Sequence, residues 1–255
     1  MKASPAAAAA GRLGYATRCS EFKVIFLLAF VAILALSGCV SSSQPLLSTE
    51  AQPPREGVSK ILVMPSDIEL SELTAGGLLE PNAAWTKSAR TNVDKALAQT
   101  LSPHGAQIVR YGVLDEDTLY DPAHVQVVKL HNAVGATIRE HKYLPALELP
   151  TKKDKFDWSL GDSVASVRSS YDADYALFIH MRDSFASAGR VAAIMFAALF
   201  NVQLQGGRQV GFASLVDLNT GDVVWFNLLR RQEGDLREPV KAKEAVDLLL
   251  KDIPL

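Results

Sequence analysis

The residues of this chain best suited to covalent chemistry are its two cysteines. Cys19 and Cys39 both lie in the first 40 residues, so the rest of the sequence has no thiol for a disulfide or a thiolate metal site. Cys39 directly follows an apolar run, Val24–Leu36, and two small residues, Ser37 and Gly38. It could be a core thiol, half of a disulfide or a point of attachment. A thiolate is a strong nucleophile and can take up a lipid.

The apolar run is thirteen residues long, and as a helix it would rise about 20 Å, short of the roughly 30 Å hydrocarbon core of a bilayer. It is typical of the central region of a secretory signal. Leu36-Ser37-Gly38-Cys39 resembles the signal motif of bacterial lipoproteins, in which a leucine and two small residues precede the modified cysteine. The resemblance implies removal of residues 1–38, and a diacylglycerol and an amino-linked acyl chain, such as palmitate, on Cys39.

The residues after Cys39 predict where the protein is held. Val40 stands where, in enteric bacteria, an aspartate favours retention at the inner membrane, so we expect anchoring at the outer membrane, facing the periplasm. Two or three acyl chains attach a soluble domain durably. Residues 39–57, rich in Ser, Pro and Gln, are expected to form a flexible tether with a reach of roughly 24 Å. Residues 58–255 are expected to form a single domain.

The charge balance argues against a nucleic-acid partner. The chain has 26 basic and 28 acidic residues, and the first 38 positions hold four of the basic and one of the acidic ones. The remaining sequence therefore has a formal charge of −5, whereas phosphate binding needs a concentrated positive surface.

Patterns of strand and helix alternate from residue 60 and predict a mixed sheet with packed helices, in the order β-α-β-α-α-β-β-β-α. Asn82 and Asp121 are candidate helix caps, and residues 66–81 are expected to form a loop through Gly76 and Gly77. On the expected strand near residue 180, Leu177 and Ile179 alternate with neighbours on the other face. The expected strands are 60–65, 106–111, 174–184 and a hairpin over 208–231, and the expected helices are 85–101, 122–141, 159–171 and one from 239.

The hairpin carries a second resemblance. Val216–Phe226 ("VDLNTGDVVWF"), before a final helix, is similar to the closing hairpin of a group of periplasmic lipoprotein domains. The group includes the amino-terminal domain of TolB, CsgG, PelC and LpoB, and "ILVMP" at residues 61–65 matches its first strand in type. The chain also resembles bacterial lipoproteins with no assigned activity. The resemblance implies an α/β sandwich that works by docking.

No catalytic or metal-binding motif can be named, and no cofactor other than the lipid is expected. The sequence lacks an H-E-x-x-H motif, and "GDSVAS" at 161–166 differs from a nucleophile elbow. His124 and His131 are seven positions apart and so share one helical face. A metal pair there is one interpretation, and a solvated polar face is the favoured one. Asp172 and Asp174 could be paired acids, but they flank the start of an expected strand, and the favoured interpretation is that they are caps. The acidic cluster 115–117 is interpreted as a turn.

Ten successive apolar residues, 191–200, form the remaining anomaly. One interpretation is a helix buried in the core. The other is a projecting helix that forms a subunit contact or a membrane-surface patch, because its circumference lacks a polar face. The contact residues would then be Ile194, Met195, Phe196, Leu199 and Phe200.

These expectations lead to one main hypothesis for function. It is a non-enzymatic lipoprotein at the outer membrane, a scaffold or accessory subunit of an envelope assembly or secretion system, with an unidentified envelope protein as partner and a capacity for homo-oligomers. The alternatives are an envelope hydrolase, with His131 or His180 brought next to carboxylates by the fold, and a subunit of a multimeric secretion channel.

Overall fold

The computed structural model describes residues 42–43, 45–55, 59–104, 106–112, 121–232 and 234–255. The chain divides into two compact units, of which the second, Ser41–Leu255, contains all of these residues. The lipoprotein motif, Leu36 to Cys39, and the acidic cluster 115–117 lie outside the described residues. All the strands and helices of the described residues therefore belong to the second unit.

One mixed sheet organises the described residues, and it has nine strands. Across the sheet the order is β1-β9-β8-β7-β3-β6, and β2 also pairs with β9. Strand β3 pairs with the first part of β7, and β4 pairs with the rest of it. Strand β5 pairs with β4. The central strand β7 is parallel to β3 and β4 and antiparallel to β8. The strands are β1 (Ser42–Ser43), β2 (Leu46–Leu47), β3 (Lys60–Val63), β4 (Asp67–Leu73), β5 (Leu79–Pro81), β6 (Gln107–Arg110), β7 (Tyr175–Ala186), β8 (Gln209–Asp217) and β9 (Val223–Arg231).

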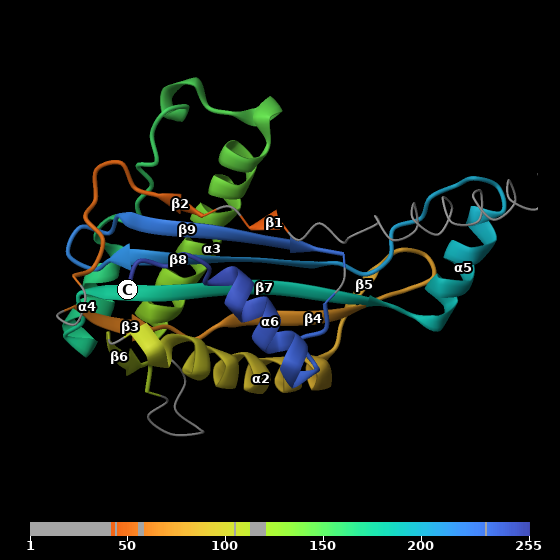
Figure 1. Ribbon diagram of the computed structural model, residues 1–255, viewed down its shortest axis with the longest axis horizontal. Coiled ribbons are helices and arrows are strands. Elements are labelled where there is room, and N and C mark those ends of the chain that lie inside the picture. Colours follow the sequence, from red (N-terminus) through yellow and green to blue (C-terminus); the bar gives the residue numbers. More distant parts are fainter. Residues whose placement is uncertain (1–41, 44, 56–58, 105, 113–120, 233) are drawn as a thin grey trace, which may run out of the picture. The chain divides into compact units, whose positions relative to one another are not determined.

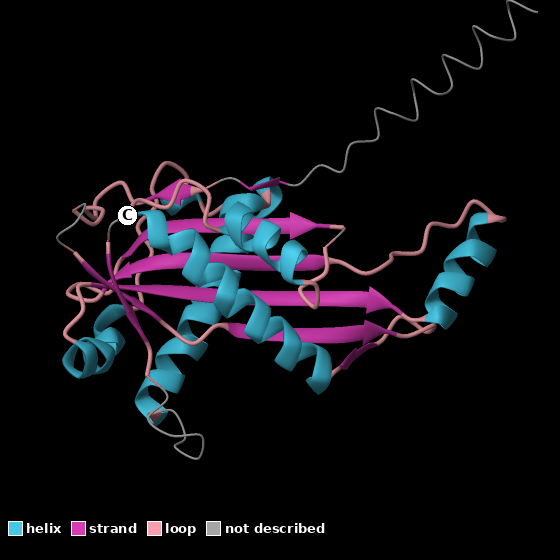
Figure 2. Cartoon of the chain, turned by 60° about the horizontal axis from the view of Figure 1, so that its bottom comes forward, coloured by secondary structure: helices cyan, strands magenta, loops and turns pink. Residues whose placement is uncertain are grey.

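Helices cover both faces of this sheet, which makes a three-layer α/β sandwich (Figure 1, Figure 2). On one face lie α2 (Ala83–Leu101) and α6 (Pro239–Leu249). On the other lie α3 (Pro122–Tyr143) and α4 (Ala165–Tyr171). A further helix, α5 (Ala188–Ala198), belongs to neither layer. Single 3-10 turns are η1 (Ser102–His104), η2 (Pro145–Leu147), η3 (Pro150–Lys152) and η4 (Gly161–Val164).

The alternation along β7 produces the two apolar cores. Leu177, Ile179 and Met181 pack under α2 and α6, while Ala176 and Phe178 face α3. This is the division of faces that the sequence predicted, since successive side chains of a strand point to opposite sides.

Local chemistry explains why the helices begin where they do. Asn82 caps α2 by accepting a hydrogen bond from the Trp85 amide at 3.0 Å, and Asp121 caps α3 by accepting from the Ala123 amide at 2.8 Å. Both caps confirm the sequence prediction. The predicted helix over 159–171 is instead the turn η4 followed by α4, whose start lacks a side-chain cap.

The hairpin over 208–231 is also confirmed, with β8 and β9 paired along their length. Gly221 in its turn has φ +81°, and a Cβ there would lie 2.3 Å from the Gly161 carbonyl oxygen. The turn therefore packs tightly on the start of η4, and the Leu160 amide donates to the Gly221 carbonyl oxygen at 2.8 Å. Only glycine fits this position without strain.

Two parts of the sheet differ from the sequence prediction. Residues 66–81, expected as a loop, contain β4 and β5, because Ile68 and Leu70 alternate with polar neighbours and bury against α2. Within the expected tether 39–57, β1 and β2 pair with β9. The prediction of a flexible tether over that whole range was therefore wrong in part. Strands β1 and β2 cover β9, which would otherwise be an open edge. The apolar side chain of Leu46 also packs against the core on the α3 side.

Candidate functional site

Helix α5 stands at the end of β7, beyond the layers that cover the sheet (Figure 1, Figure 2). Ser187 caps it by accepting a hydrogen bond from the Arg190 amide at 3.1 Å. The Arg190 guanidinium then fixes the base of the helix. It donates to the Gln205 carbonyl oxygen at 2.8 and 3.0 Å and to the Ala75 carbonyl oxygen at 3.4 Å. The loop after β4 and the segment that returns to β8 are thus tied to the start of α5.

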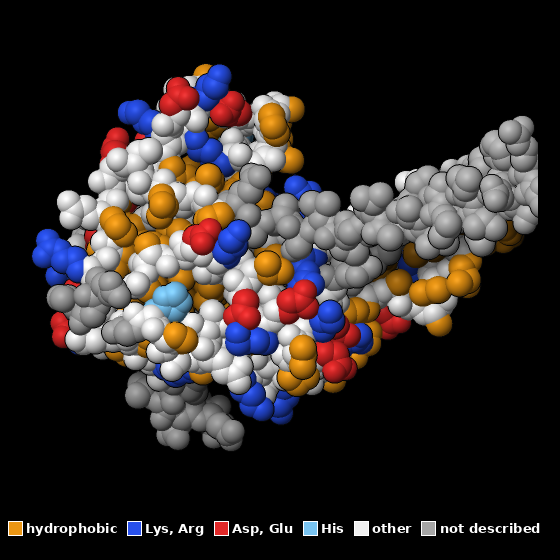
Figure 3. Space-filling view, viewed as in Figure 1, with side chains coloured by type: hydrophobic (Ala, Val, Ile, Leu, Met, Phe, Trp, Pro, Cys, Tyr) orange, Lys and Arg blue, Asp and Glu red, His pale blue; other side chains and the backbone are white. Residues whose placement is uncertain are grey.

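The apolar side chains of α5 are not part of the core. None of its residues is buried, and Met195, Phe196, Leu199 and Phe200 are between 65% and 78% exposed. Figure 3 shows hydrophobic side chains gathered over this helix. The interpretation of 191–200 as a buried helix was therefore wrong, because the chain places α5 beyond the last paired residues of the sheet. Of the five candidate contact residues, four lie fully at the surface, and Ile194 is partly buried.

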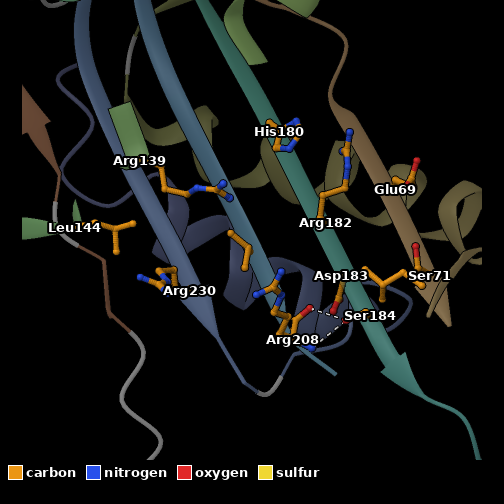
Figure 4. A pocket seen from close by; sticks show the side chains of 12 residues that line it. Glu69, Ser71, Arg139, Leu144, His180, Arg182, Asp183, Ser184, Arg208 and Arg230 are labelled. Carbon is orange, nitrogen blue, oxygen red and sulfur yellow. Dashed lines mark hydrogen bonds between the residues drawn. The ribbon is translucent and has the colours of Figure 1, made fainter. Parts of the chain in front are cut away.

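A basic pocket lies at the same end of the sheet, on the face that carries α3. It has a volume of about 390 Å³. The register explains how the sheet builds it: Arg182 of β7 lies opposite Val210, and Val210 lies opposite Arg230 of β9. Residues directly opposite one another point to the same face. Arg208, just before β8, and Arg139 of α3 complete the basic lining (Figure 4).

Of the four arginines, only Arg182 forms an ion pair among the described residues. Asp67 binds Arg182 at 3.0 Å. Burial opposes ionisation of Asp67, but hydrogen bonds from His180 and Arg182 outweigh it and hold the Asp67 pKa far below its usual range. Within the part of the chain that the structure describes, no carboxylate forms an ion pair with Arg139, Arg208 or Arg230.

Two acidic residues line the pocket, Glu69 and Asp183, and Asp183 turns its carboxylate away from it. Asp183 Oδ2 accepts hydrogen bonds from Gln209 Nε2 at 3.0 Å and from the Leu236 amide at 3.2 Å, on the side of α2 and α6. Burial raises the Asp183 pKa to about 6, against the lowering effect of these two hydrogen bonds. The carboxylate therefore does little to offset the positive charge on the α3 side.

Comparison with known proteins gives no family. No family model matches the sequence, and no curated protein sequence is similar to it. The PelC dodecamer from Paraburkholderia phytofirmans is 10% identical over 84% of this chain and 98% of that chain, with a TM-score of 0.38. Lipoprotein GNA1162 from Neisseria meningitidis is 12% identical over 69% and 81%, and the LpoB C-terminal domain from Salmonella enterica is 13% identical over 73% and 88%, both with a TM-score of 0.28. Scores this low assign neither a family nor a function to the chain.

The favoured interpretation of the histidines of α3 was wrong. His124 and His131 share a face as predicted, but that face is buried, and the two side chains are 3% and 1% exposed. His124 Nδ1 lies 2.9 Å from Tyr111 Oη, and His131 Nε2 lies 2.9 Å from Ser214 Oγ. His131 therefore attaches α3 to β8, and His124 attaches α3 to the residue that follows β6. Among the described residues, no group of three or more His, Cys, Asp or Glu side chains could hold a metal ion.

The Ser214–His131 pair has the residue types of a nucleophile and its base, but its surroundings prevent that chemistry. Ser214 is 1% exposed, and the His131 ring stacks on Phe178 with centroids 4.7 Å apart. Burial lowers the His131 pKa to about 3. A base this weak, with no route for a substrate, does not activate a hydroxyl group near neutral pH. His180, which lines the basic pocket, lies 3.4 Å from Asp67 and has no serine or cysteine bonded to it among the described contacts.

Sequence reasoning found α5 but missed the basic pocket. The four arginines come from α3, β7, the start of β8 and β9, so their spacing along the chain shows no cluster. The available signal was the register of the hairpin, which places Arg208 and Arg230 on one face once the strands are aligned. No helix among the described residues is both long and apolar enough to cross a bilayer.

Proposed function

We propose that this protein is a lipoprotein of the outer membrane that faces the periplasm and acts by binding, as a non-enzymatic scaffold or accessory subunit of an envelope assembly or secretion system. The observation that carries this proposal is α5, an apolar helix with no buried residue on a domain whose cores are complete without it.

Such a surface is costly for a protein that stays free in solution. Contiguous apolar patches on soluble proteins are usually small, and larger ones mark sites of protein or membrane contact. The side chains of α5 contribute nothing to either core cluster, so the stability of the domain does not explain them. Docking does.

The lipoprotein motif supplies the location in this proposal. Lipid on Cys39 would keep the domain at a membrane, where a docking helix meets its target at high effective concentration. The buried state of Ser214 and His131 supports a binding function over the hydrolase alternative, because the best-placed nucleophile and base are shielded from substrate.

Metabolic labelling of cells with radioactive palmitate tests the anchor. We expect label and envelope fractionation in the wild type, and loss of both in Cys39→Ser. Cys19→Ser is the matched control and should behave as the wild type, since it removes the other thiol of the chain. A wild-type protein that takes up no label and remains in the soluble fraction would overturn the proposal.

The binding role needs separate tests. Cross-linking in intact envelopes followed by mass spectrometry should capture envelope protein partners through the domain. Turnover of a cell-wall or polysaccharide substrate by the purified domain, abolished by Ser214→Ala or His180→Gln, would contradict the non-enzymatic assignment.

A further inference from the structure

The chain enters the folded domain at the same end of the sheet at which α5 leaves it. Ser42 of β1 pairs with Arg230, near the last residue of β9. Arg231 at that end of β9 lies opposite Gln209, and Gln209 lies opposite Asp183, three residues before the end of β7. Helix α5 begins two residues after β7 ends. The pairing of β9, β8 and β7 thus places Ser42 and the base of α5 at the same end of the sheet.

This arrangement limits how far a lipid on Cys39 can be from that end. Cys39 and Ser42 are three positions apart in the chain, and an extended chain spans at most about 3.6 Å per position, or about 11 Å in all. The flexible reach expected from the sequence was longer, because it counted residues that β1 and β2 fix to β9. An acylated Cys39 would therefore hold the end of the sheet that bears α5 close to the bilayer surface.

The chemistry of α5 suits that surface. From Val191 to Leu204 the chain has no charged residue. Phe196 and Phe200 lie side by side with ring centroids 5.2 Å apart, and Val202, in the segment that follows the helix, is 51% exposed. Eleven helical residues rise only about 16 Å, so α5 can lie in the headgroup and upper acyl region but cannot cross the bilayer.

The basic pocket gives this end of the domain a complementary charge. Arg208 and Arg230 are exposed and have no ion pair among the described residues, and Arg230 lies directly beside the entry point of the chain at Ser42. Arginine binds phosphate groups through parallel hydrogen bonds. Interfacial helices bind through buried apolar area together with attraction to anionic lipids, and both components are present at this end.

We propose that α5 inserts shallowly into the membrane leaflet that holds the lipid anchor, while Arg208 and Arg230 bind phosphate groups of anionic phospholipids. The helix is a second, non-covalent attachment that fixes how the domain faces the bilayer. This inference rests on the proposed function, since it is the acylated Cys39 that brings α5 to the membrane. A lone covalent tether would leave the domain free to rotate.

Vesicle flotation tests the insertion without the anchor. Residues 41–255 form a compact unit of their own and contain both core clusters, so residues 40–255 can be studied without the signal segment or Cys39. We expect this protein to float with vesicles of phosphatidylcholine and phosphatidylglycerol, and less with phosphatidylcholine alone. Phe196→Ser with Phe200→Ser should lower the partition coefficient by about tenfold for each ring.

Matched variants separate the two components. Leu47→Ser removes a leucine that is 56% exposed but lies beside Trp225, toward the other end of β9, and should not change flotation. Arg208→Gln with Arg230→Gln should abolish the preference for phosphatidylglycerol and leave binding to phosphatidylcholine unchanged. Arg168→Gln, on α4 at the far end of β7, is the control for the loss of positive charge.

The outcomes of these experiments distinguish a membrane from a second protein copy as the surface that α5 contacts. Flotation that is unaffected by the phenylalanine substitutions would overturn the proposal. The proposal would also be overturned if the protein did not bind vesicles but formed an oligomer in sedimentation experiments, and the phenylalanine substitutions dissociated that oligomer. Helix α5 would then be a contact between copies of the chain. In cells, a photoreactive residue at position 196 of the lipidated protein should cross-link to lipid, and exclusive cross-links to protein would contradict insertion. Palmitate labelling of Cys39 is independent of α5, so these results do not affect the anchor.

Discussion

The buried carboxylate of Asp183 makes the stability of the domain depend on pH in a way that one substitution isolates. Its side chain lies between β7 and the segment at Leu236, and burial raises its pKa from 3.8 to about 6 despite two hydrogen bonds. The folded protein therefore binds a proton more tightly at this site than the unfolded chain does. Asp183→Asn keeps the shape of the side chain and removes the titration.

The expected magnitude follows from the linkage between proton binding and folding. The difference between a pKa of 3.8 in the unfolded chain and about 6 in the folded protein corresponds to about 3 kcal/mol. Below pH 3.8 both states are protonated and the site has no effect on folding. As the pH rises to about 6 the unfolded chain is already ionised, so the wild type loses about 3 kcal/mol of unfolding free energy relative to the variant. Buried His131 titrates in an overlapping range with the opposite sign, but it is present in both proteins and cancels.

Urea unfolding of both proteins at intervals across this pH window provides the test. The difference in unfolding free energy, variant minus wild type, should increase with pH by about 3 kcal/mol, whatever constant offset the amide introduces. Asp154→Asn, at an exposed position, controls for the loss of one negative charge. Parallel curves for Asp183→Asn and the wild type would refute the claim that the native state retains the proton.

Three further predictions concern contacts that hold the layers and α5 together. Gly135→Ala would place a Cβ 2.1 Å from the Phe212 ring, so we expect a loss of about 1–3 kcal/mol in urea unfolding. Ser214→Ala leaves buried His131 Nε2 without its partner at 2.9 Å and should also cost about 1–3 kcal/mol. Arg190→Ala frees two carbonyl groups at the base of α5 and should speed limited proteolysis after the helix by severalfold, with little change in the global unfolding midpoint.

Each of these substitutions has a control of the same type. Gly112→Ala introduces a methyl group into open space and should leave stability within about 0.5 kcal/mol of the wild type. Ser169→Ala removes an exposed hydroxyl group, and Arg168→Ala an exposed guanidinium. If a test variant and its control behave alike, the contact assigned to that residue does not hold the structure.

Local signals in the sequence predicted the elements that local chemistry determines. The caps Asn82 and Asp121 and the hairpin turn at Gly221 are each set by residues within a few positions. The alternation along β7 predicted which side chains face which helix layer, and the clusters confirm it. The caps, the turn conformation and the strand alternation depend on residues close together in the sequence, so they could be predicted without knowledge of distant partners.

Features that depend on long-range placement were missed. An all-apolar helix such as α5 is compatible with a core or with an interface, and only its position beyond the sheet distinguishes the two. His131 was expected in solvent because polarity alone does not reveal Ser214, which is 83 positions away. β4 was recoverable, since Ile68 and Leu70 alternate with Asp67 and Glu69, but the nearby glycines favoured a loop.

One edge of β7 pairs with two successive strands, β3 and β4, and this affects how the sheet can form. The amide of Lys60, at the start of β3, donates to the Asp174 side chain from 114 positions away, and β4 pairs with the same central strand over seven residues. Contacts so distant in sequence close slowly, whereas the neighbouring hairpin joins residues close together. During synthesis, β3 and β4 are therefore made long before β7, so their apolar faces stay unpaired until most of the chain has been synthesised. Over that interval the exposed apolar faces of both strands are prone to aggregate and are natural targets for chaperones.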